Sequence, residues 1–223
     1  MSTAAHVRLH QSVLAASEKR LLIWIAGRLP RWINSDHLSA LGLASMAGAG
    51  VSFWLARTDP VAGAGLVVVF LLLNWFGDSL DGTVARVRNQ QRPRYGYYVD
   101  HVLDLAGTAL LFGGLAASGY MSPMIAVLVV AAFFLVSAEA YLATHARGVF
   151  KMAFVGIGPT ELRILLAAGA LALIGTPVIT PMGFAEIRLF DLGGIIAVIG
   201  MVITFVVTAS NNIRALYLEE TKR

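Results

Sequence analysis

The sequence predicts an all-α, polytopic membrane protein, and two observations lead to this class. Hydrophobic residues make up 57% of the 223 residues and charged residues only 13%, with a mean hydropathy of +0.73. A soluble domain needs a more polar surface, so the surplus apolar surface is expected to face a bilayer. The apolar residues also form long runs rich in Leu, Ala and Gly, without the alternation of strands. No polar linker or repeat divides them, so we expect one domain over residues 1–223.

Six apolar runs are long enough, or nearly long enough, to cross a bilayer as helices. They cover about residues 37–56, 61–86, 96–118, 123–144, 160–173 and 192–209, within a bundle expected over about 37–215. The fifth run is short if Gly175 and Pro177 end it, although Val178 and Ile179 could extend it past a kink.

The segment ahead of these runs, about residues 7–29, mixes apolar and basic side chains. Leu21 and Trp24, for example, stand close to Lys19 and Arg20. This mixture is typical of an amphipathic helix lying in the membrane interface. An ordinary helix packed against the spans is the alternative.

Basic residues are distributed unequally between the two ends of the predicted bundle. Of 17 Lys and Arg, only Arg57 and Arg188 fall in connections on one side. The positive-inside rule therefore predicts that both termini are cytoplasmic, which agrees with an even number of spans.

Four carboxylates are concentrated at the predicted cytoplasmic ends of the second and third spans. Asp78 and Asp81 are three residues apart, and Asp100 and Asp104 four apart, so each pair projects from one helix face. A charged carboxylate in hydrocarbon costs on the order of 3 kcal/mol unless it is neutralised. We therefore expect the pairs to face each other across antiparallel helices. Carboxylates without Cys or a His set prefer Mg²⁺, Mn²⁺ or Ca²⁺, and two Mg²⁺ or Mn²⁺ ions suit displacement at phosphorus.

Small and basic residues accompany the carboxylates. Gly82 would let a ligand approach the backbone, Ala85 lies one turn after Asp81 on the same face, and Gly96 opens the partner helix. Four arginines lie between or beside the two pairs: Arg86, Arg88, Arg92 and Arg94. Their guanidinium groups suit phosphate oxygens, although the positive-inside rule explains them as well.

Eight positions in this region resemble the signature of the CDP-alcohol phosphotransferase family: Asp78, Asp81, Gly82, Ala85, Arg86, Gly96, Asp100 and Asp104. The pattern is Asp, two residues, Asp-Gly, two residues, Ala-Arg, a variable stretch, then Gly, Asp and Asp at intervals of four. Nine residues separate Arg86 from Gly96 where the family pattern has eight, and the extra one falls in a predicted loop. The predicted spans and interfacial helix are similar to the family as well.

This resemblance implies an enzyme of phospholipid synthesis that transfers a substituted phosphate group from a CDP-alcohol to an acceptor alcohol and releases CMP. It implies Mg²⁺ or Mn²⁺ as cofactor, two ions in number, with Ca²⁺ as a substitute or inhibitor. The implied metal ligands are Asp78, Asp81, Asp100 and Asp104, and Asp104 would complete the site or accept the proton of the acceptor hydroxyl. The implied contacts to CDP are Gly82, Ala85, Arg86 and Gly96. Membrane lipid and a second copy of the chain are the expected partners, and no nucleic acid is expected. The active site would lie near the cytoplasmic face.

The resemblance does not decide which CDP-alcohol is the donor, because two branches of that family use different donors. One branch takes CDP-diacylglycerol and a soluble acceptor, and the other takes CDP-choline or CDP-ethanolamine and diacylglycerol. His101, directly after Asp100, and the stretch 158–161 resemble the second branch and make His101 a candidate general base. A polar residue making one hydrogen bond is the alternative for His101.

Several further polar residues are candidates for holding a phosphate or orienting a ligand. Those around the fourth connection are Arg147, Lys151, Glu161 and Arg163, although the positive-inside rule and helix-start preferences explain them nearly as well. Asn74, one turn before Asp78, is expected to orient a metal ligand or to hydrogen-bond another helix.

A membrane transporter or cation channel is the alternative class, because intramembrane carboxylates often mark ion paths. Clustering near one face, with Gly, Ala and Arg at fixed offsets and without repeated halves, favours the enzyme.

Overall fold

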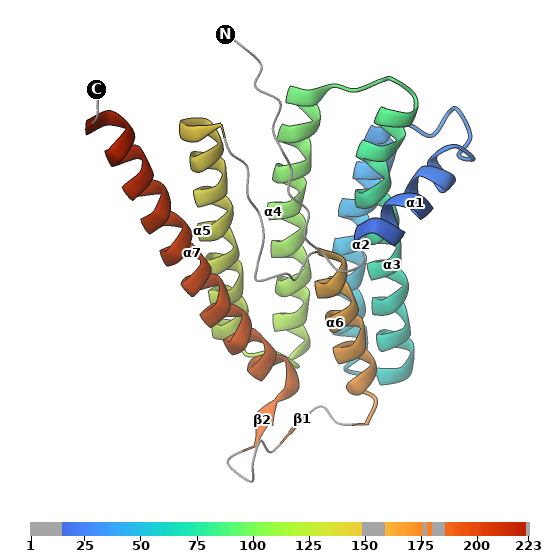
Figure 1. Cartoon of the computed structure of the whole chain (residues 1–223). Coiled ribbons are helices and arrows are strands. Elements are labelled where there is room, and N and C mark those ends of the chain that lie inside the picture. The colour runs from blue at the N-terminus through green and yellow to red at the C-terminus, as the bar shows by residue number, and fades with distance from the viewer. Residues whose placement is uncertain (1–14, 149–158, 176–177, 180–185, 222–223) are drawn as a thin grey trace.

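The computed structural model describes residues 15–148, 159–175, 178–179 and 186–221, which are almost entirely helical (Figure 1). The helices are α1 (Ala15–Ala26), α2 (Ser35–Leu55), α3 (Pro60–Val87), α4 (Pro93–Ser118), α5 (Pro123–Arg147), α6 (Pro159–Ala172) and α7 (Leu189–Thr221). Between α6 and α7, the two-residue strands β1 (Val178–Ile179) and β2 (Ile187–Arg188) pair antiparallel. The all-α class is confirmed.

Five of the helices in the described ranges, α2, α3, α4, α5 and α7, are long and apolar enough to cross a membrane. They run up and down: α2 packs against α3 and α4, and α5 packs against α4 and α7 (Figure 1). The protein is therefore an integral, polytopic membrane protein, as the composition predicted.

Helix α6 differs from the predicted fifth span in length. Its 14 residues extend about 21 Å, against a hydrocarbon core of about 30 Å. It lies at the predicted position and packs against α3, but it is visibly shorter than its neighbours (Figure 1). A turn in which the Gly175 amide donates to the Ala172 carbonyl follows it directly, so α6 alone does not have the length of a span.

Proline and glycine set many of the helix boundaries. Four helices carry proline at their first residue: Pro60, Pro93, Pro123 and Pro159. Proline is tolerated there because the missing N–H would have had no partner within the helix. Glycines with positive φ end α4 and α5, Gly119 at +79° and Gly148 at +67°.

Helix α1 has features of both predicted alternatives for the N-terminal segment, an interfacial helix and a helix packed against the spans. Residues 1–14 of this segment lie outside the described ranges. Leu22 and Ala26 are buried against α3, whereas Trp24 is 55% exposed with the Arg28 guanidinium 3.9 Å above its ring. Such an exposed apolar face suits the membrane interface. The Glu18 carboxylate also accepts hydrogen bonds from Trp75 of α3 (2.6 Å) and Thr160 of α6 (2.9 Å), so α1 is fastened to both.

Glycines bring the backbone of α2 into contact with both of its neighbours. A Cβ on Gly77 of α3 would lie 2.5 Å from the Leu38 carbonyl oxygen, and one on Gly114 of α4 would lie 2.3 Å from the Gly50 carbonyl oxygen. No side chain tolerates such distances, so these helices approach as closely as their backbones allow. This contact fixes α3 and α4 relative to α2.

Replacing Gly114 with Val is expected to destabilise the protein, because the side chain would press against the Gly50 backbone, which cannot rotate away. Overpacking of this kind costs about 1–3 kcal/mol, or more against backbone. Thermal unfolding in detergent should show a lower midpoint. Gly113→Ala is the matched control, since a Cβ there meets nothing within 4 Å among the described residues. Equal midpoints for the two variants would contradict the close contact.

Candidate active site

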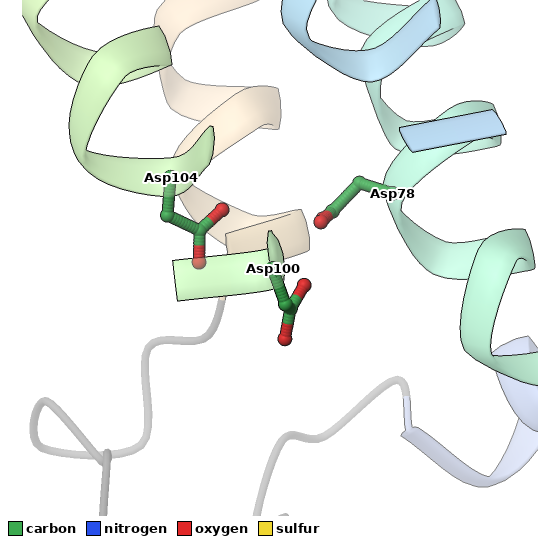
Figure 2. Close-up of side chains that lie close together, drawn as sticks. All are labelled: Asp78, Asp100 and Asp104. Atoms are coloured by element: carbon green, nitrogen blue, oxygen red, sulfur yellow. The ribbon is translucent and has the colours of Figure 1, made fainter. Parts of the chain in front are cut away.

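Three carboxylates from two helices form a compact cluster. Asp78 of α3 and Asp100 and Asp104 of α4 each offer an oxygen, and these oxygens lie within 4.8 Å of one another. Asp78 and Asp104 point toward each other across the space between the helices, and Asp100 lies beside them (Figure 2). A five-residue connection, 88–92, joins α3 to α4 and lets them run antiparallel, as the spacing predicted. Three partly buried carboxylates with only oxygen donors match the preference of Mg²⁺ and Mn²⁺.

Asp81, the fourth predicted ligand, lies outside this three-residue cluster. Its carboxylate accepts a hydrogen bond from the Ser39 hydroxyl of α2 (2.6 Å) and another from the Gly82 amide. Helix α2, at its closest approach to α3, therefore holds this side chain. Its role as a metal ligand stays a prediction.

Arg163 of α6 brings a positive charge to the cluster. Its guanidinium forms an ion pair with Asp78, and its Nε donates to Asn74 Oδ1 (2.7 Å). The Arg163 side chain is only 15% exposed. Asn74 in turn donates to the Gly42 carbonyl of α2 (2.9 Å), so it makes the interhelical hydrogen bond that was one of its two predicted roles. The structure thus places Arg163 beside the carboxylates, and its role in binding a phosphate stays a prediction.

The other candidate phosphate-binding residues lie elsewhere or are not described. Arg147, in the last turn of α5, donates to Asn212 of α7 and lies 3.8 Å from Glu219. Asn212 also donates to Glu139 (2.6 Å), which gives this intramembrane carboxylate a partner. Arg147 therefore fastens α5 to α7. Glu161 lies in the first turn of α6, and Lys151 is outside the described residues.

Of the predicted CDP-contacting residues, Gly96 has open space beside it among the described residues, whereas Gly82 lies against the Arg86 side chain. Arg86 is exposed and donates to Thr83 Oγ1 (2.9 Å). A Cβ added to Gly82 would lie 3.3 Å from Arg86 Nη1, and one added to Gly96 would meet nothing within 4 Å in the described part of the chain. Ala85 is half-buried. A nucleotide contact at these four positions is compatible with this arrangement and stays a prediction.

His101 is buried on the side of α4 that faces α5. Its Nδ1 lies 2.7 Å from the Tyr97 carbonyl oxygen and 3.8 Å from Asp100 Oδ2. A carbonyl only accepts, so Nδ1 carries the proton and Nε2 is the basic atom. The ring packs against Tyr97 and Tyr141, with centroids 4.1 and 4.9 Å away. These contacts fit the alternative that His101 is a polar residue making one hydrogen bond. Its role as general base stays a prediction.

Two of the arginines between the carboxylate pairs have structural partners. Arg88 donates to the carbonyls of Leu29 (2.8 Å) and Pro30 (3.1 Å), and Arg92 pairs with Asp36. Arg88 therefore holds the connection between α1 and α2 against the end of α3, and Arg92 joins the connection between α3 and α4 to the first turn of α2. Sequence reasoning missed the two site contacts from α2, Ser35 and Ser39, because they depend on how helices pack.

A helical membrane bundle that gathers three of the four motif carboxylates in one cluster is typical of a class, the membrane enzymes that transfer phosphate-containing groups. The family model of the CDP-alcohol phosphatidyltransferases matches residues 38–208, and the chain belongs to this family. It is therefore a phosphotransferase of phospholipid synthesis, and the family decides against a transporter or channel. No curated protein sequence matches the chain.

Two solved structures of the phosphatidylinositol phosphate synthase PgsA1 from Mycobacterium tuberculosis are similar in fold. The structure with CDP-DAG bound has a TM-score of 0.63 and 22% identity, covering 86% of this chain and 94% of that chain. The structure in complex with manganese and citrate has a TM-score of 0.63 and 20% identity, covering 86% of this chain and 88% of that chain.

Proposed function

We propose that the protein transfers the phosphatidyl group of CDP-diacylglycerol to the hydroxyl of a polar acceptor, with Mg²⁺ or Mn²⁺ held by the aspartates. The observation that carries this proposal is the cluster of Asp78, Asp100 and Asp104 with Arg163 paired to one of its members. The CDP-DAG bound to the similar synthase supports the choice of donor, and the manganese in its second structure supports the choice of cofactor. The position of Arg163 suits an acceptor that carries its own phosphate group.

The donor set fits two hard divalent ions. Asp78, Asp100 and Asp104 would hold one ion, and Asp81 would join them for the second, since all four offer carboxylate oxygens. When bound, the ions would neutralise the negative charge on the phosphate oxygens of the donor and of the leaving CMP.

The residues of the chain would supply the remaining steps. The acceptor oxygen forms a bond to the β-phosphorus of the donor, and the bond from that phosphorus to the bridging oxygen of CMP breaks. Asp104 would take the proton of the acceptor hydroxyl. Arg86 would donate to the diphosphate, and Gly96 leaves room for the nucleotide. Gly82 would let the Arg86 guanidinium lie close to the backbone of α3.

We place the active site at the cytoplasmic face, with both termini on that side. The arginine-rich connection between α3 and α4 lies at the same end of the bundle as the end of α7 (Figure 1). Cytoplasmic ends of membrane helices carry most of the Lys and Arg, which supports this orientation. A homodimer is expected by analogy with the family.

CMP release from the purified protein in lipid vesicles tests the proposal. One mixture would hold CDP-diacylglycerol with polar acceptors, and the other would hold CDP-choline or CDP-ethanolamine with diacylglycerol. We expect CMP from the first mixture, including acceptors that carry a phosphate. CMP from the second mixture alone would instead assign the chain to the aminoalcohol branch and give His101 a role. No CMP from either mixture would contradict the proposal.

Removing divalent ions with a chelator is expected to abolish CMP release, because the clustered carboxylates would repel the diphosphate of the donor. Adding Mg²⁺ or Mn²⁺ in excess should restore the rate, and Na⁺ at equal ionic strength is the control. Full activity after chelation would contradict a metal-dependent reaction.

A further inference from the structure

Two serines of α2 hold Asp81 of α3. Ser35 Oγ donates to the Asp81 carbonyl oxygen (2.7 Å), and Ser39 Oγ lies 2.6 Å from Asp81 Oδ2. One serine therefore contacts the backbone of this residue and the other contacts its carboxylate. Both are half-buried, and they lie one helical turn apart.

The Ser39 hydroxyl has one proton and two acceptors within reach. Besides Asp81 Oδ2, the Ser35 carbonyl oxygen lies 3.0 Å away. A carboxylate is the stronger acceptor, and hydrogen bonds to it are shorter than bonds between neutral groups, as observed here. The Ser39 hydroxyl therefore donates to the Asp81 carboxylate, and the Ser35 carbonyl is the weaker of the two acceptors.

The start of α2 is fixed, so the serines have little freedom to move. Asn34 caps the helix by accepting from the His37 amide (2.9 Å), while the His37 ring accepts from the Asn34 amide. Further along, Gly77 of α3 lies against the Leu38 carbonyl, so the two backbones touch within one turn of Asp81. The distance from Ser39 to the carboxylate is thus set by backbone packing.

We infer that Ser39 is a positioning residue for the metal site, which holds the Asp81 carboxylate in the orientation that lets it serve as a ligand. The Gly82 amide holds the other oxygen, so each oxygen has one hydrogen bond and keeps a further lone pair for an ion. Hydrogen bonds of this kind around metal ligands fix their orientation and typically change metal affinity 10–100-fold. The inference rests on the proposed function, because it takes Asp81 as a ligand.

Mn²⁺ binding to the full-length protein in detergent, measured by electron paramagnetic resonance, tests this inference. We expect Ser39→Ala to weaken binding about 10–100-fold, and Ser39→Thr, which keeps the hydroxyl, to restore most of it. Ser45→Ala is the matched control: Ser45 lies on the same helix, is buried, and bonds only to the Leu41 carbonyl (2.7 Å) in the described residues. The thermal midpoints of the two alanine variants, measured with chelator, should be similar.

Other outcomes separate the inference from the proposed function. Wild-type-like Mn²⁺ binding by Ser39→Ala, while the wild-type protein binds Mn²⁺ and releases CMP, would overturn the inference alone. An equal loss of binding in Ser45→Ala would also overturn it, because the effect would then come from the helix. A wild-type protein that binds no Mn²⁺ would overturn both the inference and the proposed metal site.

Discussion

Replacing Asp104 with Asn is expected to lower the rate of CMP release by about 10²–10⁴-fold. An amide cannot take the proton from the hydroxyl of the acceptor alcohol, and it does not bind a cation as a carboxylate does. The shape of the side chain is nearly unchanged, so the protein should remain folded. Removing one of three clustered negative charges should even relieve their repulsion. The measurement is CMP release at saturating donor and acceptor, together with thermal unfolding in detergent.

Two further variants make this result interpretable. Asp191→Asn changes an aspartate of α7 whose carboxylate accepts from the Ser122 amide, away from the cluster, and should keep its turnover. Asp81→Asn should lose activity if the fourth carboxylate is a ligand. Full activity in both Asp104→Asn and Asp81→Asn would show that the proposed site is wrong.

Replacing Arg163 with Gln is expected to lower the free energy of unfolding by about 3 kcal/mol in the presence of chelator. The change removes the partner of a half-buried carboxylate, and breaking buried pairs costs about this much. Removing both charges, with Asp78→Asn and Arg163→Gln together, should cost less than the sum of the single changes. Unfolding in mixed micelles gives the four free energies of this double-mutant cycle.

The outcome of the cycle decides whether the ion pair joins α6 to α3. A coupling free energy near zero would show that the pair contributes nothing to stability. In the Arg163→Gln variant, loss of activity toward acceptors that carry a phosphate, with activity toward uncharged acceptors retained, would identify Arg163 as a phosphate-binding residue. Equal loss toward both kinds of acceptor would contradict that role.

Three of the four predicted carboxylates form a cluster, and this much could be predicted because it depends on local geometry. Residues three or four apart share a helix face, and a short connection makes neighbouring helices antiparallel, so Asp78 and Asp104 had to approach each other. The ends of α4 are also marked locally: it ends at Ser118 before Gly119, as the run 96–118 predicted, but it begins at Pro93, ahead of the predicted start at Gly96. Their physical causes act within a few residues of the chain.

The contacts from α2 and α6 could not be predicted, because they join residues far apart in sequence. Ser39 and Asp81 are 42 positions apart, and Arg163 and Asp78 are 85 apart. Which side chains meet depends on the crossing of the helices, and that crossing depends on glycines such as Gly77, whose spacing only suggests close packing. The length of α6 was uncertain for another reason: Val178 and Ile179 are apolar enough to extend it, yet they form a strand.

The backbone contacts of α2 also have a consequence for how a lipid reaches the aspartates. Helices that touch through glycine cannot slide or separate without losing their packing along the whole interface, so α2, α3 and α4 are expected to move as one rigid body. The flexibility needed to admit a long-chain substrate sideways from the bilayer would then belong to α5, α6 and α7. Helix α6 is short and carries Arg163 to the cluster, so its displacement would uncover the site and withdraw a positive charge from it in one motion.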